Sequence, residues 1–410
     1  LTTDIYPADF NWTANWATPA RGEDRLLAAA GEVNGIKNSG VYERTIQLDY
    51  DDAVAETSVR KLHDLARSDD PRPFALFASF THPHDPFAIP RRYWDRYRHA
   101  DIDMPALGAM ARDALDAHSR RLFDHIGVAE AAMTEEEVRV ARHAYYGAVS
   151  YVDDQVGRLL AALADSGFAD DTVVVLLSDH GEALGERGLW FKRSFFDVAL
   201  RIPLIVRRPG AAPARRTENV SLVNLFPTVL DLADPDHGLG QVETAYGGRS
   251  LKPLLEGGRL AGADRVIAEM SGEGLNAPAV AVIEGGHKFI HCPGDPPLLF
   301  ERARDPLETA NLAGRPEVAE VEARLAGFVA ENWDFDALRE TVLESQRRRR
   351  LIDRAHAVGA TPSWDFDTDV PGRDQFFRAC PENPSASNYN SDFQVRARPD
   401  AETPNVRVHP

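Results

Sequence analysis

A continuous apolar run that ends in a short polar motif constrains the fold of this chain more than any other feature of its sequence. Residues 171–177 (DTVVVLL) are followed directly by residues 178–182 (SDHGE). A strand that is buried on both faces of a parallel sheet has a continuous apolar run of this kind. Open α/β sheets carry their chemistry at the carboxyl ends of such strands. The pattern therefore predicts an α/β protein with a functional site at the end of this strand.

Asp179 and His180 within this motif allow two interpretations. A carboxylate oxygen and an imidazole nitrogen side by side can bind a divalent metal ion. An Asp-His pair at a strand end can also cap a helix or form hydrogen bonds within a loop. We favour the metal site because the pair belongs to a longer motif, residues 176–193 (LLSDHGEALGERGLWFKR), which also contains Lys192.

This longer motif resembles the metal- and sulfate-binding loop of the type I sulfatases, a family within the alkaline phosphatase superfamily. The likeness is strongest to the choline sulfatases, and it spans about residues 1–365, which is most of the chain. The other segments that carry it are residues 80–86 (FTHPHDP), 1–16 (LTTDIYPADFNWTANW), 195–196, 201–206, 222–233, 344–350 (ESQRRRR) and 364–365.

The resemblance implies an α/β fold like that of alkaline phosphatase and the sulfatases. We expect a mixed, mainly parallel sheet flanked by helices, a smaller C-terminal antiparallel sheet with a helix, and an extended C-terminal tail. In this interpretation residues 1–240 form the larger part of the catalytic domain, without its N-terminal strands. Residues 241–360 form a smaller α+β subdomain, and residues 361–410 form a tail that contacts a neighbouring subunit.

Local patterns predict where several elements lie. Residues 74–80 (FALFASF) are a second candidate for a buried strand, and Thr134 followed by three glutamates predicts the start of a helix. Residues 234–262 are rich in Gly, Asp and Pro, which predicts a boundary between domains. Short strands are expected over residues 202–206, 265–268, 279–283 and 288–291.

The composition narrows the classes of partner. A formal net charge of −18 argues against nucleic acid, because phosphate binding needs a concentrated basic face. No stretch stays apolar over the ~20 residues that a helix needs to span a bilayer. Two cysteines are too few for a disulfide framework, which fits a reducing compartment. We therefore expect a cytoplasmic bacterial protein that binds neither nucleic acid nor membrane.

By resemblance, Lys192 and His84 carry the catalysis, and Asp179 and His180 fill two of the family's four protein ligand positions. A lysine is a compact cation suited to a tetrahedral anion, and a histidine titrates in the range that acid-base catalysis needs. Taken singly, Lys192 could be a surface lysine and His84 a loop histidine, but both motifs are intact. His82 either contacts the substrate or has a structural role. One divalent ion is expected, Ca²⁺ first, with Mn²⁺ or Mg²⁺ as alternatives.

Two further family features are missing from the sequence. Type I sulfatases carry a Cys-x-Pro-x-Arg signature, whose Cys or Ser becomes the formylglycine nucleophile, and a pair of adjacent aspartates that completes the metal site. Cys292 and Cys380 both lie outside any such signature. We therefore expect an N-terminal companion segment to supply formylglycine, and we expect this chain to be inactive without it.

The resemblance also suggests the substrate, a small sulfate ester such as choline sulfate or a similar alkyl sulfate. Trp12 and Glu273 match the aromatic ring and the carboxylate that surround a quaternary ammonium in the choline sulfatases. Residues 26–29 and 384–385 depart from the pattern of those enzymes, which leaves the alcohol part of the ester open. The tail suggests a homo-oligomer, a dimer or a tetramer. The alternatives are a phosphonate monoester or phosphodiester hydrolase, and a pseudoenzyme with a binding role.

Overall fold

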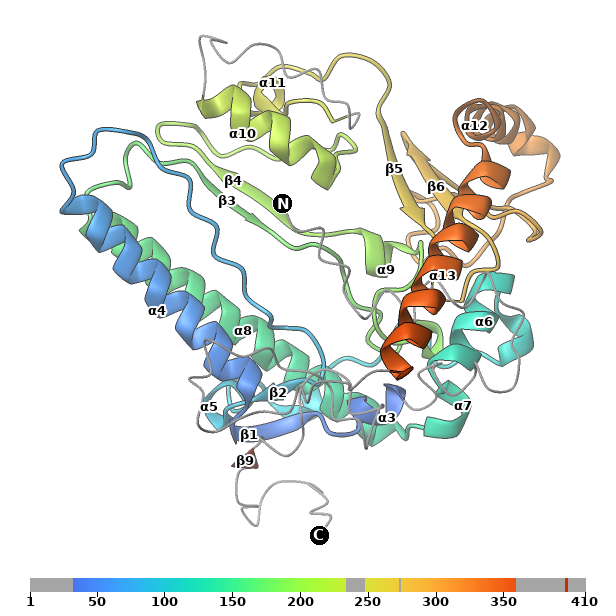
Figure 1. The fold of residues 1–410 in the computed structure, drawn as a ribbon, viewed down its shortest axis with the longest axis horizontal. Coiled ribbons are helices and arrows are strands. Elements are labelled where there is room, and N and C mark those ends of the chain that lie inside the picture. The colour runs from blue at the N-terminus through green and yellow to red at the C-terminus, as the bar shows by residue number, and fades with distance from the viewer. Residues whose placement is uncertain (1–31, 234–247, 273, 359–394, 397–410) are drawn as a thin grey trace.

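The structure is a computed structural model that describes residues 32–233, 248–272, 274–358 and 395–396 (Figure 1). A pair of long helices lies on one side of the molecule and a four-stranded antiparallel sheet on the other. The loops that follow the predicted motif strand run between these two parts. This arrangement places the candidate site where the two parts meet.

Helix α8 (Glu135–Asp165) is one of the two long helices. It begins at Thr134, which forms a capping box with Glu137, so the predicted helix start is confirmed. The other long helix, α4 (Ile46–Ala66), packs beside its second half through a cluster of apolar side chains. Gly147, in the first half of α8, packs closely against Ile89. A Cβ atom at this position would lie 2.0 Å from Ile89 Cδ1, so a larger residue would require the Ile89 side chain to shift.

A small mixed sheet lies against α8. Strand β1 (Gly40–Arg44) pairs in parallel with β2 (Ala88–Ile89) and antiparallel with β9 (Val395–Arg396). Val41 and Ile89 are buried in the core that these strands share with α8. The short elements around this core are α3 (Glu32–Ile36), α5 (Arg91–Trp94), η2 (His99–Asp101), η3 (Arg112–Ala114), α6 (Ala117–His125) and α7 (Val128–Ala131).

The strand predicted before the motif is present as β3 (Val174–Leu177), but its predicted burial in a parallel sheet is not seen among the described residues, where Leu176 is 37% exposed. It pairs antiparallel with β4 (Leu204–Arg207), which lies close to the strand predicted over residues 202–206. The connections around this pair contain η4 (Glu186–Gly188), α9 (Asp197–Leu200), η5 (Leu222–Asn224), α10 (Leu225–Ala233) and α11 (Lys252–Leu255).

The prediction of a buried strand over residues 74–80 was wrong. No ladder joins this segment to any other described residue, and the Phe77 side chain is 79% exposed. A strand needs hydrogen-bond partners along its edge and cover on its faces, and the described parts of the chain bring neither to this segment. The apolar surface of β4 is open too, since Ile205 is 59% exposed.

The expected smaller antiparallel sheet is confirmed. Its strands are β5 (Arg265–Met270), β6 (Ala279–Glu284), β7 (His287–His291) and β8 (Leu298–Glu301), in that order. Alternate residues of β6 pack into two different apolar cores. Ala281 packs against the segment that follows Lys192, whereas Val282 packs against helix α12 (Ala319–Asn332). Burial on both faces explains why β6 is apolar throughout. A turn, η6 (Pro316–Val318), precedes α12.

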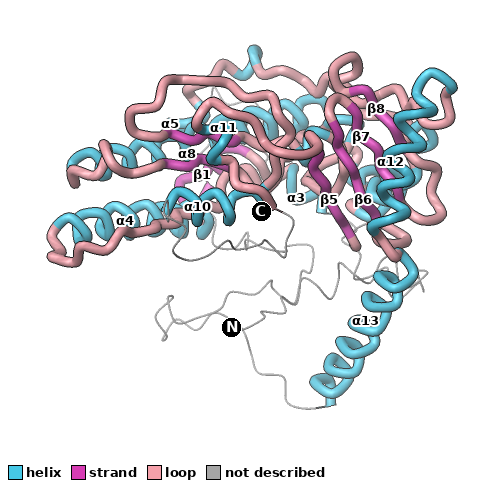
Figure 2. The backbone as a smooth tube through the Cα atoms, turned by 90° about the horizontal axis from the view of Figure 1, so that it is seen from above, coloured by secondary structure: helices cyan, strands magenta, loops and turns pink. Residues whose placement is uncertain are grey.

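Helix α13 (Phe335–Val358) projects from this sheet and out of the body formed by the other labelled elements, as Figure 2 shows. Val358, the last residue of this helix, is 91% exposed. Apart from β9, the predicted tail over residues 361–410 lies outside the described residues, and the predicted domain bounds stay a prediction. Within the described ranges, no helix combines the length and hydrophobicity that a bilayer crossing requires.

Candidate active site

Strand β3 leads into a hydrogen-bonded turn that displays Asp179 and His180. Ser178 Oγ donates to the His180 carbonyl oxygen at 2.8 Å, and the His180 backbone N–H donates to Asp179 Oδ1 at 2.9 Å. Gly181 closes the turn against α9, where a Cβ atom would lie 2.1 Å from the Val198 carbonyl oxygen. The sequence after β3 therefore folds this way because a polar Ser-Asp-His run is followed by the one residue that fits beneath α9.

The geometry of Asp179 and His180 fits two ligands of one divalent ion. His180 Nδ1 lies 2.8 Å from the Gly181 carbonyl oxygen, so Nδ1 carries the proton and Nε2 keeps its lone pair. Nε2 lies 3.4 Å from Asp179 Oδ2. Neighbouring ligand atoms around an ion with bonds of about 2.1 to 2.4 Å are separated by about 3 Å. A small adjustment brings both atoms to a single ion.

The electrostatic surroundings favour the neutral imidazole that metals bind. Burial lowers the pKa of His180, the hydrogen bond to Gly181 opposes this shift, and the charge of Lys192 and the nearby His84 lower the pKa further. The Asp179 carboxylate opposes the effect of these two charges on the pKa of His180. Over the described residues, no group of three or more His, Cys, Asp or Glu side chains has the geometry of a metal site. Among the described residues, the predicted metal site therefore rests on Asp179 and His180 alone.

His84 and Lys192, the two predicted catalytic residues, are in direct contact. Lys192 Nζ lies 2.6 Å from His84 Nε2. An ammonium group has only donors, so Nε2 must accept this hydrogen bond. The remaining ring proton is then on Nδ1, which lies 2.8 Å from the Asp85 carbonyl oxygen. The backbone is held as well, because Gln47 Nε2 donates to the His84 carbonyl oxygen at 3.0 Å.

His82 occupies a different environment, which supports the structural one of its two predicted roles. Its side chain is buried, with Nδ1 2.7 Å from Asp51 Oδ2 and Nε2 3.4 Å from the Ala88 carbonyl oxygen. Asp51 also accepts from the backbone N–H groups of Thr81 and His82, at 2.7 and 2.9 Å. Both ring nitrogens therefore face protein atoms. His82 and Asp51 hold the loop that presents His84, and the sequence offered no signal for Asp51.

The loop between Ala183 and Lys192 is a tight hairpin with unusual backbone geometry. The Ala183 N–H donates to the Phe191 carbonyl oxygen at 2.8 Å. Leu184, Arg187 and Phe191 have φ values of 49°, 58° and 68° in the left-handed region. Non-glycine residues occupy this region at an energetic cost, and such residues gather at functional sites. The loop is therefore held in shape by contacts from outside.

Glu182 and Glu186 supply two of these contacts, and motif similarity alone did not single out either. Glu182 Oε1 accepts from the Phe191 N–H at 2.5 Å. Burial of the Glu182 carboxyl group raises its pKa to about 7, and the nearby Asp85 carboxylate adds to the rise. Glu186 accepts from the backbone N–H groups of Ala106 and Leu107 at 2.9 and 2.8 Å.

A buried ion cluster ties the end of this loop to the C-terminal sheet. Lys288 of β7 is completely buried, and its Nζ atom lies 2.5 Å from Asp197 Oδ1 and 2.5 Å from Glu308 Oε1. It also donates to the Phe195 carbonyl oxygen at 2.9 Å. Charges removed from water need close partners, and here two carboxylates provide them. The sheet thereby supports the segment that follows Lys192.

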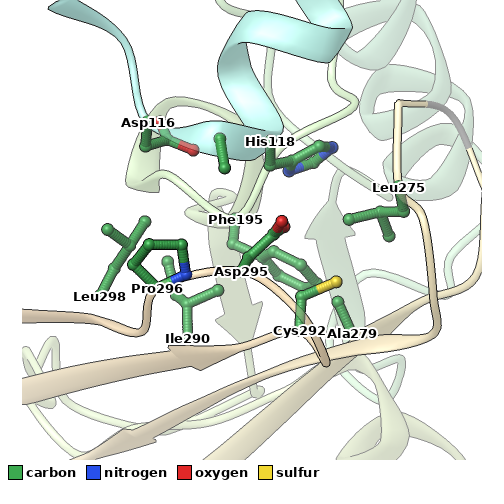
Figure 3. Close-up of a pocket in the computed structure, with 11 residues that line it drawn as sticks. Asp116, His118, Phe195, Leu275, Ala279, Ile290, Cys292, Asp295, Pro296 and Leu298 are labelled. Carbon is green, nitrogen blue, oxygen red and sulfur yellow. The ribbon is translucent and has the colours of Figure 1, made fainter.

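The predicted substrate residues Trp12 and Glu273 lie outside the described residues. Among the described residues, a small pocket is lined by Asp116, His118, Phe195, Leu275, Cys292 and Asp295 among others (Figure 3). None of the four predicted catalytic and metal residues lines it. Burial raises the pKa of the Cys292 thiol to about 12, so this group stays protonated.

Comparisons with known proteins found matches over most of this chain. A family model described as "Sulfatase" matches residues 2–235, and one described as "Choline sulfatase enzyme C terminal" matches residues 340–381. A choline-sulfatase of Rhizobium meliloti is 39% identical over 384 residues, which cover 92% of this chain and 74% of that protein.

Other relatives are matched over a smaller share of their length. An arylsulfatase of Clostridium perfringens is 28% identical over 264 residues, which cover 62% of this chain and 52% of that protein. The crystal structure of a phosphonate monoester hydrolase of Agrobacterium radiobacter superposes with a TM-score of 0.54 at 28% identity, covering 71% of this chain and 61% of that one. The chain thus spans about half the length of the arylsulfatase that it matches.

Proposed function

This chain belongs to the sulfatase family, and from that premise we propose that it takes part in the hydrolysis of a small sulfate ester to an alcohol and inorganic sulfate. The expected family and the sulfatase-like α/β fold are thereby confirmed. The observation that carries the proposal is the 2.6 Å contact between Lys192 Nζ and His84 Nε2, beside the Asp179–His180 pair.

Lys192 supplies positive charge for the sulfuryl oxygens. An ammonium group has three N–H donors, so Lys192 can donate to His84 and to a sulfuryl oxygen at the same time. A preorganised cation stabilises the charge that develops on these oxygens when the S–O bond breaks. His84 Nε2, as the acceptor, directs the ammonium toward the substrate.

The leaving alcohol oxygen needs a proton when the S–O bond to it breaks. Lys192 and His84 both act on His180 of the proposed metal pair through their charge, and we assign the proton to an N–H group of Lys192. A proton from water then restores the ammonium. In sum, the ester and one water give the alcohol and hydrogen sulfate, with no change of oxidation state.

Asp179 and His180 would hold one divalent ion, which when bound supplies Lewis acidity toward the sulfuryl group. Their donor set of one carboxylate and one imidazole suits Ca²⁺, Mn²⁺ or Mg²⁺, and we propose Ca²⁺. We further propose that a companion segment contributes the formylglycine nucleophile and the missing ligands.

The open apolar surface supports the companion segment. Phe77 and Ile205 are 79% and 59% exposed on two extended segments, and burying such side chains stabilises a protein by about 1.5 to 3 kcal/mol each. Denaturing mass analysis of the native particle tests the proposal. A second polypeptide with a formylglycine in a Cys-x-Pro-x-Arg peptide is expected, and an active preparation that contains this chain alone would overturn it.

We propose choline sulfate as the substrate, with Trp12 and Glu273 around the quaternary ammonium, a homo-oligomer formed through the tail, and a cytoplasmic location. The choline-sulfatase similarity, which includes the C-terminal match over residues 340–381, supports choline sulfate as the substrate. Phosphonate monoester hydrolysis is the second candidate, favoured by the structural similarity to the Agrobacterium enzyme.

Initial rates of the native particle on choline sulfate, an aryl sulfate and an aryl phosphonate monoester test the function. We expect turnover of the sulfate esters, with choline sulfate fastest. A preparation that hydrolyses the phosphonate ester but neither sulfate ester would replace the first candidate by the second.

A further inference from the structure

Glu182 has no role in the chemistry described above, although it shares a loop with the residues that do. Its Oε1 atom lies 2.5 Å from the Phe191 backbone nitrogen and 3.5 Å from the Leu184 backbone nitrogen. One carboxylate oxygen thus faces both ends of the hairpin. Phe191 immediately precedes Lys192, so a contact to Phe191 acts on the backbone that carries the ammonium group.

Both of these N–H groups belong to residues in the left-handed region, with φ of 49° at Leu184 and 68° at Phe191. Residues with a Cβ atom leave this region readily unless their surroundings hold them there. Glu182 therefore holds the two strained positions between which the chain reverses.

We propose that Glu182 is a positioning residue for Lys192, an inference that rests on the proposed function of Lys192. Glu182 fixes the Phe191 backbone, and this directs Lys192 Nζ to its place 2.6 Å from His84 Nε2. Lys192 then meets the sulfuryl group already oriented. Loss of the Glu182 acceptor lets the Phe191–Lys192 backbone relax and moves the ammonium away from His84.

The same carboxylate could instead act through its charge, because Asp85 and Lys192 both lie within its electrostatic range. Two substitutions separate these roles. Glu182→Gln keeps an oxygen acceptor for the Phe191 N–H and removes the charge, whereas Glu182→Ala removes both. If Glu182 acts through the hydrogen bond, Glu182→Gln keeps Lys192 Nζ beside His84 and Glu182→Ala does not.

Glu186→Ala is a matched control from the same hairpin. Glu186 accepts two backbone hydrogen bonds, from Ala106 and Leu107, but it holds the far end of the loop. Its removal loosens the hairpin without touching Phe191. General weakening of the loop would therefore affect Lys192 equally in Glu182→Ala and Glu186→Ala.

The readout is the ¹⁵Nζ and ¹³Cε signal of Lys192 in lysine-labelled native particle, together with kcat on choline sulfate. The chain has five lysines, so the signal is assigned by its loss in Lys192→Arg. In Glu182→Ala we expect the signal to move to the position of an exposed lysine and kcat to fall about 100-fold. In Glu182→Gln and Glu186→Ala the signal stays in place.

An unmoved Lys192 signal in Glu182→Ala overturns the inference, as does a signal that moves as far in Glu182→Gln as in Glu182→Ala. If Glu182→Ala fails to fold, Glu182→Gln decides, because it keeps the volume and the acceptor: a displaced signal there overturns the inference, and an unmoved one supports it. Wild-type particle that hydrolyses no sulfate ester while the signals behave as expected overturns the proposed function and leaves the positioning role intact.

Discussion

Lys192 Nζ and His84 Nε2 lie 2.6 Å apart, although 108 positions of the sequence separate the two residues. Each comes from a loop whose shape is set by carboxylates, Asp51 for the loop of His84 and Glu182 for the loop of Lys192. The pair of side chains that the proposed chemistry needs is thus assembled from two independently supported loops. The predictions below test this pair, the metal ligands, the supporting ion cluster and the response to pH.

Removal of the Lys192 ammonium should abolish most of the activity. Lys192→Ala is expected to lower kcat by about 10²- to 10³-fold, because one preorganised group that stabilises developing charge contributes about that much. Steady-state kinetics on choline sulfate measures the change. Lys37→Ala, which removes a surface lysine paired with Glu137 at 3.7 Å, is the control and should leave kcat unchanged. Equal losses in both variants would contradict the role of Lys192.

The proposed metal ligands should make stability depend on Ca²⁺. After chelation, Ca²⁺ at about 100 times its Kd should stabilise the native particle by about 2.7 kcal/mol, because only the folded state has the site. Asp179→Ala should abolish this gain, as followed by thermal unfolding. Asp171→Ala removes a carboxylate ahead of the same strand and should keep the gain in full. A gain that persists in Asp179→Ala would exclude this ligand.

The buried ion cluster should contribute strongly to stability. Lys288→Met leaves Glu308 without its buried cation, whereas Asp197 keeps its ion pair with Arg302 at 3.1 Å, and the change is expected to cost about 3 to 5 kcal/mol of the free energy of unfolding. Urea denaturation measures the loss. Arg304→Met breaks an exposed pair with Glu301 and should cost less than about 1 kcal/mol. Similar losses in the two variants would show that burial does not set the strength of these pairs.

His125 should make the protein less stable in mild acid. Burial lowers the pKa of His125 to about 4, with a smaller contribution from the Arg193 charge, whereas the ordinary value is 6.5. Between these two pH values the unfolded chain therefore binds a proton at His125 that the folded state does not bind. The stability due to this group is present above pH 6.5 and is lost as the pH falls toward 4.

The corresponding loss from about pH 7 to about pH 5 is about 2 kcal/mol. His125→Gln should remove that part of the pH dependence, as seen in urea unfolding at the two pH values. His63→Gln, on the last turn of α4, is the control and should keep the wild-type pH dependence. An unchanged slope in His125→Gln would contradict the assignment.

Much of the local structure could be predicted from the sequence. The run over residues 171–177, the glutamates after Thr134 and the short apolar strands of the C-terminal sheet each depend on neighbours along the chain. Motif similarity also predicted His84 and Lys192, which the fold brings into contact, and Asp179 and His180, whose geometry fits a metal pair. The roles of these four residues stay proposals that the experiments above test.

What the sequence determined by itself was periodic structure and the chemistry of short motifs, because both depend on residues close together in the chain. Tertiary structure alone decided which groups surround those residues. It left residues 74–80 without strand partners among the described residues, buried His82 against Asp51 and placed Glu182 against the Phe191 N–H. It also buried Lys288 between Asp197 and Glu308. The burial, the ion pairing and the orientation of these side chains depend on contacts between distant segments, and such contacts exist only once the chain has folded.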